Sequence, residues 1–194
     1  MTGEPAAKNW DSAKTWHLAQ INVGRARGAM DSPVMAGFAA QLESINQLAE
    51  STPGFVWRLK DEGGDATSFR IFEDPMMMVN ASVWESIEAL RDFVYRSSHS
   101  QVMRGRAEWF EKPGEAYTAL WWVPAGHIPT LEELRDRLAH RRAHGDTAYA
   151  FGFARTFSAP GAETAGSQLS APGAETAGAL PIENWSTPEC GWQE

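Results

Sequence analysis

The residues best suited to chemistry gather in one segment, residues 84–110 (WESIEALRDFVYRSSHSQVMRGRAEWF). His99 falls at a break between two expected helices, and imidazole is the side chain most readily used as a base or acid near neutral pH. At a helix N-terminus the helix dipole would favour its neutral form. We therefore predict His99 as a catalytic base. The alternative is a structural or interface histidine bound to a backbone carbonyl.

Two arginines follow in the second of these helices. Arg104 and Arg106 are two positions apart, so their side chains point in different directions and at most one should enter a pocket. A guanidinium there would bind a carboxylate, phenolate or enolate. We predict a catalytic role for these arginines, with Arg106 ahead of Arg104. The alternative is a surface arginine, or an ion pair with Glu108 or Asp92.

Aromatic and polar residues suggest where a ligand would bind. Four tryptophans are candidates for an aromatic wall around a planar molecule: Trp57, Trp84, Trp109 and Trp121. They could equally belong to the core. Two expected strands carry polar residues on one face, where a core strand would be apolar: Gln20 and Asn22 in the first, Asn80 and Ser82 in the other. We predict Asn22 and Asn80 as substrate-binding residues.

Hydrophobic periodicity predicts the elements that must position these groups. Alternation predicts strands at 16–23, 55–60, 76–84, 117–123 and 149–157, and a short strand or irregular edge at 69–72. Apolar residues at helical spacing predict helices at 33–49, 87–96, 99–110 and 131–144. Thr130 and Glu133 have the spacing of a capping box at the start of the last helix. The pattern is that of an α+β domain with one helical layer on an antiparallel sheet.

Composition bounds the domain organisation and the partners. With 194 residues, 43% of them hydrophobic, the chain is long enough for one core. We expect a flexible arm at 1–14, one domain at 15–157, and a linker and tail at 158–194, where SAPGAETAG occurs at 158–166 and again at 170–178. The formal charge of −8 argues against nucleic acid and anionic membranes as partners. One cysteine, Cys190, and no apparent signal peptide indicate a cytoplasmic protein.

Segments within 15–157 resemble a known family. WESIEALRDFVYRSSH followed by MRGRAEWF, the strand LWWVPAGHIPT and the helix EELRDRL are similar to an uncharacterised bacterial family of the dimeric α+β barrel superfamily, related to antibiotic biosynthesis monooxygenases. The resemblance implies a ferredoxin-like fold whose sheet pairs with that of a second copy in a homodimer. It also implies a small-molecule pocket between helices and sheet. Relatives include cofactor-independent oxygenases of aromatic polyketides, haem-degrading oxygenases, cyclases and isomerases.

Two functional hypotheses follow. The first is a cofactor-independent monooxygenase, or a related isomerase or cyclase, of secondary metabolism. In it His99 removes a proton, Arg106 stabilises the enolate or phenolate, and the carbanion reduces oxygen. The alternative is a non-catalytic binding protein for haem or another planar ligand. No metal site is expected, because the pair His140 and His144 would need further ligands. Nucleotide-binding and serine-hydrolase motifs are lacking from the sequence.

Overall fold

A four-stranded antiparallel sheet forms the centre of the domain. The computed structural model describes residues 16–96 and 105–162. The strands are β1 (Trp16–Arg25), β2 (Phe55–Arg58), β3 (Met77–Trp84) and β4 (Thr118–Pro124), and their order in the sheet is β2-β3-β1-β4. β1 pairs with both β3 and β4, so it lies at the middle of the sheet. This order confirms the predicted α+β class and ferredoxin-like antiparallel sheet.

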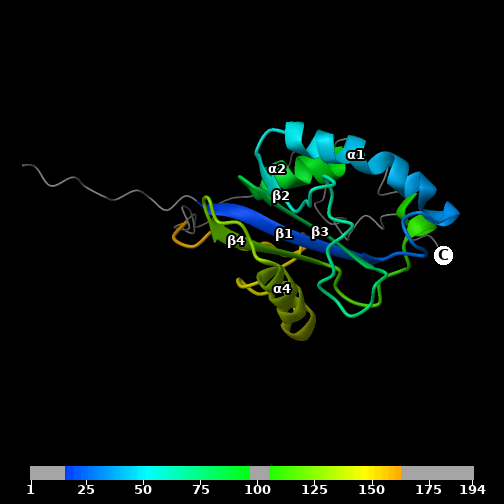
Figure 1. Ribbon diagram of the computed structural model, residues 1–194. Helices are drawn as coiled ribbons and strands as arrows, with labels where there is room; N and C mark the ends of the chain where they lie inside the picture. The colour runs from blue at the N-terminus through cyan, green and yellow to red at the C-terminus, as the bar shows by residue number, and fades with distance from the viewer. Residues whose placement is uncertain (1–15, 97–104, 163–194) are drawn as a thin grey trace, which may run out of the picture.

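Helices from the first half of the chain form the predicted helical layer on one face of the sheet (Figure 1). The layer contains the short 3-10 helix η1 (Pro33–Met35), α1 (Ala36–Ser51), α2 (Ile87–Arg91) and the π-helical turn η2 (Asp92–Arg96). Ser86 caps α2, because its side chain accepts a hydrogen bond from the amide of Ala89 at 3.1 Å. Residues 105–109 are also helical.

The last helix, α4 (Leu131–His144), lies on the opposite face of the sheet (Figure 1). Its Leu134 and Leu138 are fully buried against a set of apolar strand residues. That set is Ala19, Ile21, Val23, Val79, Ala81, Val83, Ala119, Trp121 and Val123. Side chains of the segment 59–77, such as Phe69 and Phe72, pack against the same cluster. The predicted single helical layer is therefore incomplete, because α4 and the segment 59–77 cover the second face of the sheet within one chain.

This arrangement bears on the expected homodimer. In a barrel made by two copies, the sheet face without helices packs on that of the partner. Here α4 and the segment 59–77 occupy that face, and the strand residues of the set named above are at most 4% exposed. Two copies that keep α4 in place would have to associate through another surface.

The start of α4 keeps half of the predicted capping box. The hydroxyl of Thr130 accepts a hydrogen bond from the amide of Glu133 at 3.1 Å. The Glu133 carboxylate accepts instead from the Trp121 indole at 2.9 Å and lies 2.7 Å from Nε2 of His127. Glu133 therefore ties α4 to β4 rather than closing the box.

The predicted strand at 149–157 is wrong. Only isolated bridges form there, between Leu120 and Phe151 and between Gly152 and Arg155. The next acceptor along β4, the carbonyl of Thr118, takes a hydrogen bond from Arg141 at 2.6 Å. The same guanidinium lies where a Cβ on Gly152 would be. Because Arg141 occupies this edge of β4, the chain turns away after one pair of hydrogen bonds.

The other predicted segments are the short strand or irregular edge at 69–72, the N-terminal arm and the C-terminal tail. Residues 69–72 take the irregular alternative rather than the strand. The arm at 1–14 and most of the tail at 158–194 lie outside the described residues, and the domain limits stay predictions. Within residues 16–96 and 105–162, no helix combines the length and apolarity needed to cross a bilayer.

Candidate functional site

A cavity of about 230 Å³ lies between the helical layer and the sheet. Its floor is the face of β1 and β3 that carries the polar residues picked out in the sequence. Phe38, Leu42 and Ile45 of α1 line it from above, and they are only half-buried. Of the residues of α1, only Ala49 is buried. The first half of the apolar stripe of α1 therefore faces an open space, whereas Leu48 and Ala49 pack with the cluster that contains Trp84.

The strand register orders the floor of this cavity into rows across the sheet. One row places Asn22 of β1 between Asn80 of β3 and Thr118 of β4. The next row pairs Gln20 with Ser82, and a third pairs Leu18 with Trp84. The floor thus changes from amide and hydroxyl groups at one end to large apolar side chains at the other. A ligand with one polar and one apolar end would match this gradient.

A chain of hydrogen bonds runs along the floor. Asn22 Nδ2 donates to Gln20 Oε1 at 3.4 Å, and Gln20 Nε2 donates to Ser82 Oγ at 2.9 Å. The indole Nε1 of Trp84 donates to the same Ser82 Oγ at 2.8 Å. The buried polar groups in the sheet are therefore held in place by one another, which accounts for their presence in a core strand.

The apolar end of the cavity is built from stacked aromatic rings. Trp84 is fully buried. Its ring stacks on Phe93, with centroids 5.1 Å apart, and meets the edge of Phe55 at 5.3 Å. Leu90 of α2 also lines this end. These contacts fix the indole plane, so this end of the cavity has a rigid support.

Arg106 lines the cavity as a nearly buried cation. It is 8% exposed, and its guanidinium lies over the ring of Tyr117 at 4.7 Å from the centroid. A nearly buried arginine stacked on an aromatic face has the chemistry to hold an anion, because the low dielectric strengthens the attraction and the planar guanidinium suits a carboxylate or phenolate. Tyr117 was not predicted as a site residue, because no sequence pattern links residues eleven positions apart across a loop.

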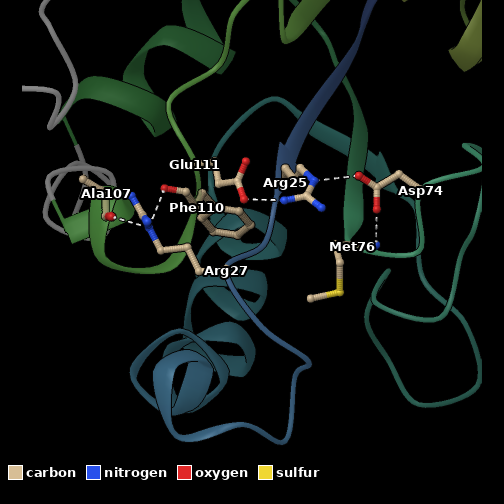
Figure 2. A network of polar contacts seen from close by, with 7 residues as sticks. All are labelled: Arg25, Arg27, Asp74, Met76, Ala107, Phe110 and Glu111. Atoms are coloured by element: carbon tan, nitrogen blue, oxygen red, sulfur yellow. Dashed lines mark hydrogen bonds and ion pairs between the residues drawn. The ribbon is translucent and has the colours of Figure 1, made fainter.

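The helical segment that carries Arg106 is clamped to the end of β1 by two arginines (Figure 2). Arg25 bridges Asp74, at 2.7 Å, and Glu111. The Arg27 guanidinium donates to the carbonyls of Ala107 and Phe110, at 3.1 and 3.2 Å. These carbonyls lie at the end of a helix, where they lack helical partners.

Backbone hydrogen bonds reinforce the clamp. The amide of Arg27 donates to the carbonyl of Trp109 at 2.8 Å, and the amide of Glu111 donates to the carbonyl of Arg25 at 2.9 Å. Gly24 lets the ring of Phe110 approach, since a Cβ there would lie 2.8 Å from the ring. The wall formed by Arg106 and Trp109 is therefore anchored to the sheet.

The clamp gives stability a dependence on pH. The amide of Met76, followed by the guanidinium of Arg25, holds the pKa of Asp74 below its ordinary range. Because the folded-state pKa lies below the unfolded value of about 3.9, the carboxylate stabilises the fold above that pH, and this contribution is lost as pH falls through the folded pKa. We expect Asp74→Asn to lose less stability than the wild type when urea unfolding is compared at about pH 6 and pH 3. Equal losses would contradict this role.

The predicted aromatic wall needs correction. Trp84 and Trp109 line the cavity, but Trp57 and Trp121 pack on the other face of the sheet, with the cluster beneath α4. In β4, Trp121 shares the face of Ala119 and Val123. In β2, an irregularity between Phe55 and Trp57 shifts the register, so that Phe55 pairs with Trp84 whereas Trp57 pairs with Val83. The shift turns Trp57 to the opposite face.

The other predicted site residues divide in two groups. Asn22, Asn80 and Arg106 line the cavity together. His99 and Arg104 lie outside the described residues, so their roles stay predictions. Among the residues that the structure describes, no group of three or more histidine, cysteine, aspartate or glutamate side chains could hold a metal.

Haem requires an axial ligand to its iron and a large cavity. Its described lining contains neither histidine nor cysteine, the usual strong axial ligands. Its volume of about 230 Å³ lies below the 300–1,000 Å³ or so of pockets for drug-sized ligands. The volume of the cavity therefore suits a ligand smaller than haem.

Fold and cavity together define a ferredoxin-like α+β domain with a ligand-sized hollow between its helices and its sheet. The family described as a domain of unknown function, DUF3291, matches residues 17–168. The chain belongs to this family, in agreement with the predicted resemblance. No curated protein matches the sequence.

Three solved structures are similar to this chain. A protein of unknown function from Nitrosomonas europaea is 15% identical over 60% of this chain and 98% of its own, with a TM-score of 0.39. A protein assigned as an antibiotic biosynthesis monooxygenase from Chloroflexus aurantiacus is 15% identical over 59% and 98%, with a TM-score of 0.32. A monooxygenase from Streptomyces coelicolor, in complex with nanaomycin D, is 16% identical over 60% and 95%, with a TM-score of 0.34.

Proposed function

We propose that this protein binds a small planar organic anion of one or two fused rings and oxidises it without a cofactor. The observation that carries the proposal is the graded cavity, with buried Arg106 and the amides of Asn22 and Asn80 among its polar groups and Trp84 stacked on Phe93 at its apolar end. A carboxylate, phenolate or enolate would pair with the guanidinium. The rings would lie toward the apolar end of the cavity, which Trp84 supports.

The proposed reaction needs only the substrate, oxygen and a base. For a probe such as 1-naphthol, the base takes the hydroxyl proton, and the electron-rich ring reduces oxygen. The carbon opposite the hydroxyl gains one oxygen atom, and its hydrogen leaves with the hydroxyl hydrogen and the second oxygen atom as water. The product is 1,4-naphthoquinone. We assign the base to His99 and the stabilisation of the phenolate to Arg106 before Arg104.

Binding of 2-naphthoate tests the anion site. We expect Arg106→Ala to weaken binding about 10- to 100-fold by isothermal titration calorimetry, because hydrogen bonds to a charged group contribute about 1.5–3 kcal/mol. Arg135→Ala is the matched control, since that arginine has 54% of its side chain exposed on α4. Equal affinities in all three proteins would contradict a role for Arg106 in binding.

Oxygen uptake with 1-naphthol separates catalysis from binding alone. The wild type should consume oxygen faster than a protein-free blank, and His99→Ala should return the rate to the blank while keeping its affinity for 2-naphthoate. If the wild type binds 2-naphthoate but consumes no oxygen, the binding-protein alternative is favoured. Unchanged turnover in His99→Ala would remove the assigned role of the histidine.

Two further parts of this proposal concern the molecule as a whole. We propose a homodimer, whose contact lies away from the face that α4 covers. A mass of one chain by multi-angle light scattering would contradict it. We also propose a cytoplasmic location, which cell fractionation would test.

A further inference from the structure

We propose that the hydroxyl of Ser82 is a ligand-binding donor that fixes a carbonyl or similar acceptor on the floor of the cavity. This inference rests on the proposed function and adds a second recognition point to it. Ser82 lies in the middle of β3, is 7% exposed and lines the cavity. The hydrogen bonds at Ser82 Oγ indicate this role.

The Ser82 oxygen already accepts two hydrogen bonds. The indole nitrogen of Trp84 can only donate, so the bond of 2.8 Å fixes Ser82 as the acceptor there. The Gln20 amide nitrogen donates the second, at 2.9 Å. This direction agrees with the next bond along the chain, in which the Gln20 oxygen accepts from Asn22. Both lone pairs of the hydroxyl oxygen are therefore in use.

The hydrogen of the same hydroxyl needs an acceptor. None of the hydrogen bonds among the described residues has the Ser82 hydroxyl as its donor. Its two neighbours across the sheet are Gln20, which donates to it, and Arg58, whose guanidinium has no acceptor atom. Leu90, Phe93 and Val94 of the helical layer, which also line the cavity, carry apolar side chains. A buried donor without an acceptor costs about 1–3 kcal/mol, so a ligand acceptor at this point would be favoured.

Two accepted bonds also make the hydroxyl a better donor. Hydrogen bonds in a chain polarise one another, and here both accepted bonds come from buried side chains, those of Gln20 and Trp84. The donor is rigid as well, because Trp84 is held between Phe55 and Phe93. The ligand class that fits both recognition points is an aromatic anion with a separate carbonyl group, such as a hydroxyquinone.

Two probes and two variants test this inference. The probes are 2-naphthoate, an anion without a further carbonyl, and 2-hydroxy-1,4-naphthoquinone, an anion that carries further carbonyl oxygen. In Ser82→Ala we expect the quinone to lose about 3- to 10-fold more affinity than 2-naphthoate, as for one neutral hydrogen bond. Ser82→Thr, which keeps the hydroxyl, should restore the wild-type ratio of the two affinities. Circular dichroism checks that each variant is folded.

The ratio of affinities is the decisive quantity. If Ser82 only supported Trp84 and Gln20, both probes would weaken by the same factor in Ser82→Ala, and the inference would be overturned. That result would leave the proposed function standing, provided that 2-naphthoate still depends on Arg106. If the wild type binds neither probe, the proposed function fails and the inference fails with it. Should Ser82→Ala not fold, Ser82→Cys, with its weaker donor, is expected to shift the ratio in the same direction.

Discussion

Replacing Trp84 with alanine is expected to lower the free energy of unfolding by about 3–5 kcal/mol. The side chain is fully buried and belongs to the cluster that joins β1 and β3 to α2. Its removal would also break the stack on Phe93 and the edge contact with Phe55, each worth about 0.5–1.5 kcal/mol beyond the buried area. Urea unfolding followed by circular dichroism measures the loss.

The phenylalanine variant separates the ring contacts from the hydrogen bond of the indole. Trp84→Phe keeps an aromatic ring beside Phe93 but leaves Ser82 with one accepted bond, so we expect a smaller loss than in the alanine variant. A loss below about 1 kcal/mol in Trp84→Ala would show that this wall is not part of the core. Ligand affinity should fall in both variants, because the indole supports the apolar end of the cavity and donates to Ser82.

The sequence was sufficient to predict which residues of each central strand share a face. In β1 and β3 the polar residues alternate with apolar ones, and strand geometry sends alternate side chains to opposite faces. Gln20 and Ser82, placed together by register, therefore reach one face. The apolar alternates, such as Ile21 and Ala81, reach the other and are fully buried. Here the local pattern and the tertiary contacts agree.

Trp57 and Trp121, which were predicted on the wrong face of the sheet, show which information the alternation of residue types lacks. Alternation tells which residues of one strand share a face, but not which of the two faces of the sheet that is. For Trp121 the answer depends on the pairing of β4 with β1, a contact between segments about 100 residues apart. For Trp57 it depends on the irregularity in β2, which changes the face within four residues. Neither is a local property of the sequence.

The cavity itself was implied only indirectly. The apolar stripe on α1 predicts that the helix packs on the sheet, yet Phe38, Leu42 and Ile45 remain half-buried above an open space. Periodicity reports which side of a helix is apolar and not how far the helix stands from the sheet. That distance depends on large side chains, such as Phe93 and Trp109, that lie between the layers. The volume and its polar gradient therefore required the structure.

Replacing Leu138 with alanine is expected to cost about 2–5 kcal/mol of unfolding free energy. Leu138 is fully buried and belongs to the cluster that joins α4 to the sheet. Within one chain, α4 and the segment 59–77 cover this face of the sheet. They must therefore shield the strand residues beneath them from water. Arg135→Ala, on the exposed side of the same helix, should change stability by less than about 0.5 kcal/mol.

The same pair of variants tests whether the helix replaces a partner sheet. If α4 is the permanent cover of this face, Leu138→Ala should unfold in a single transition at lower urea, with the mass by light scattering unchanged from the wild type. If the wild type instead pairs through the sheet face with α4 displaced, Leu138 would be exposed. The alanine variant would then match Arg135→Ala in stability. The difference in unfolding free energy between the two variants therefore distinguishes the two arrangements. A large difference indicates that α4 covers the sheet of its own chain, and no difference indicates that the sheet of a second copy packs there instead.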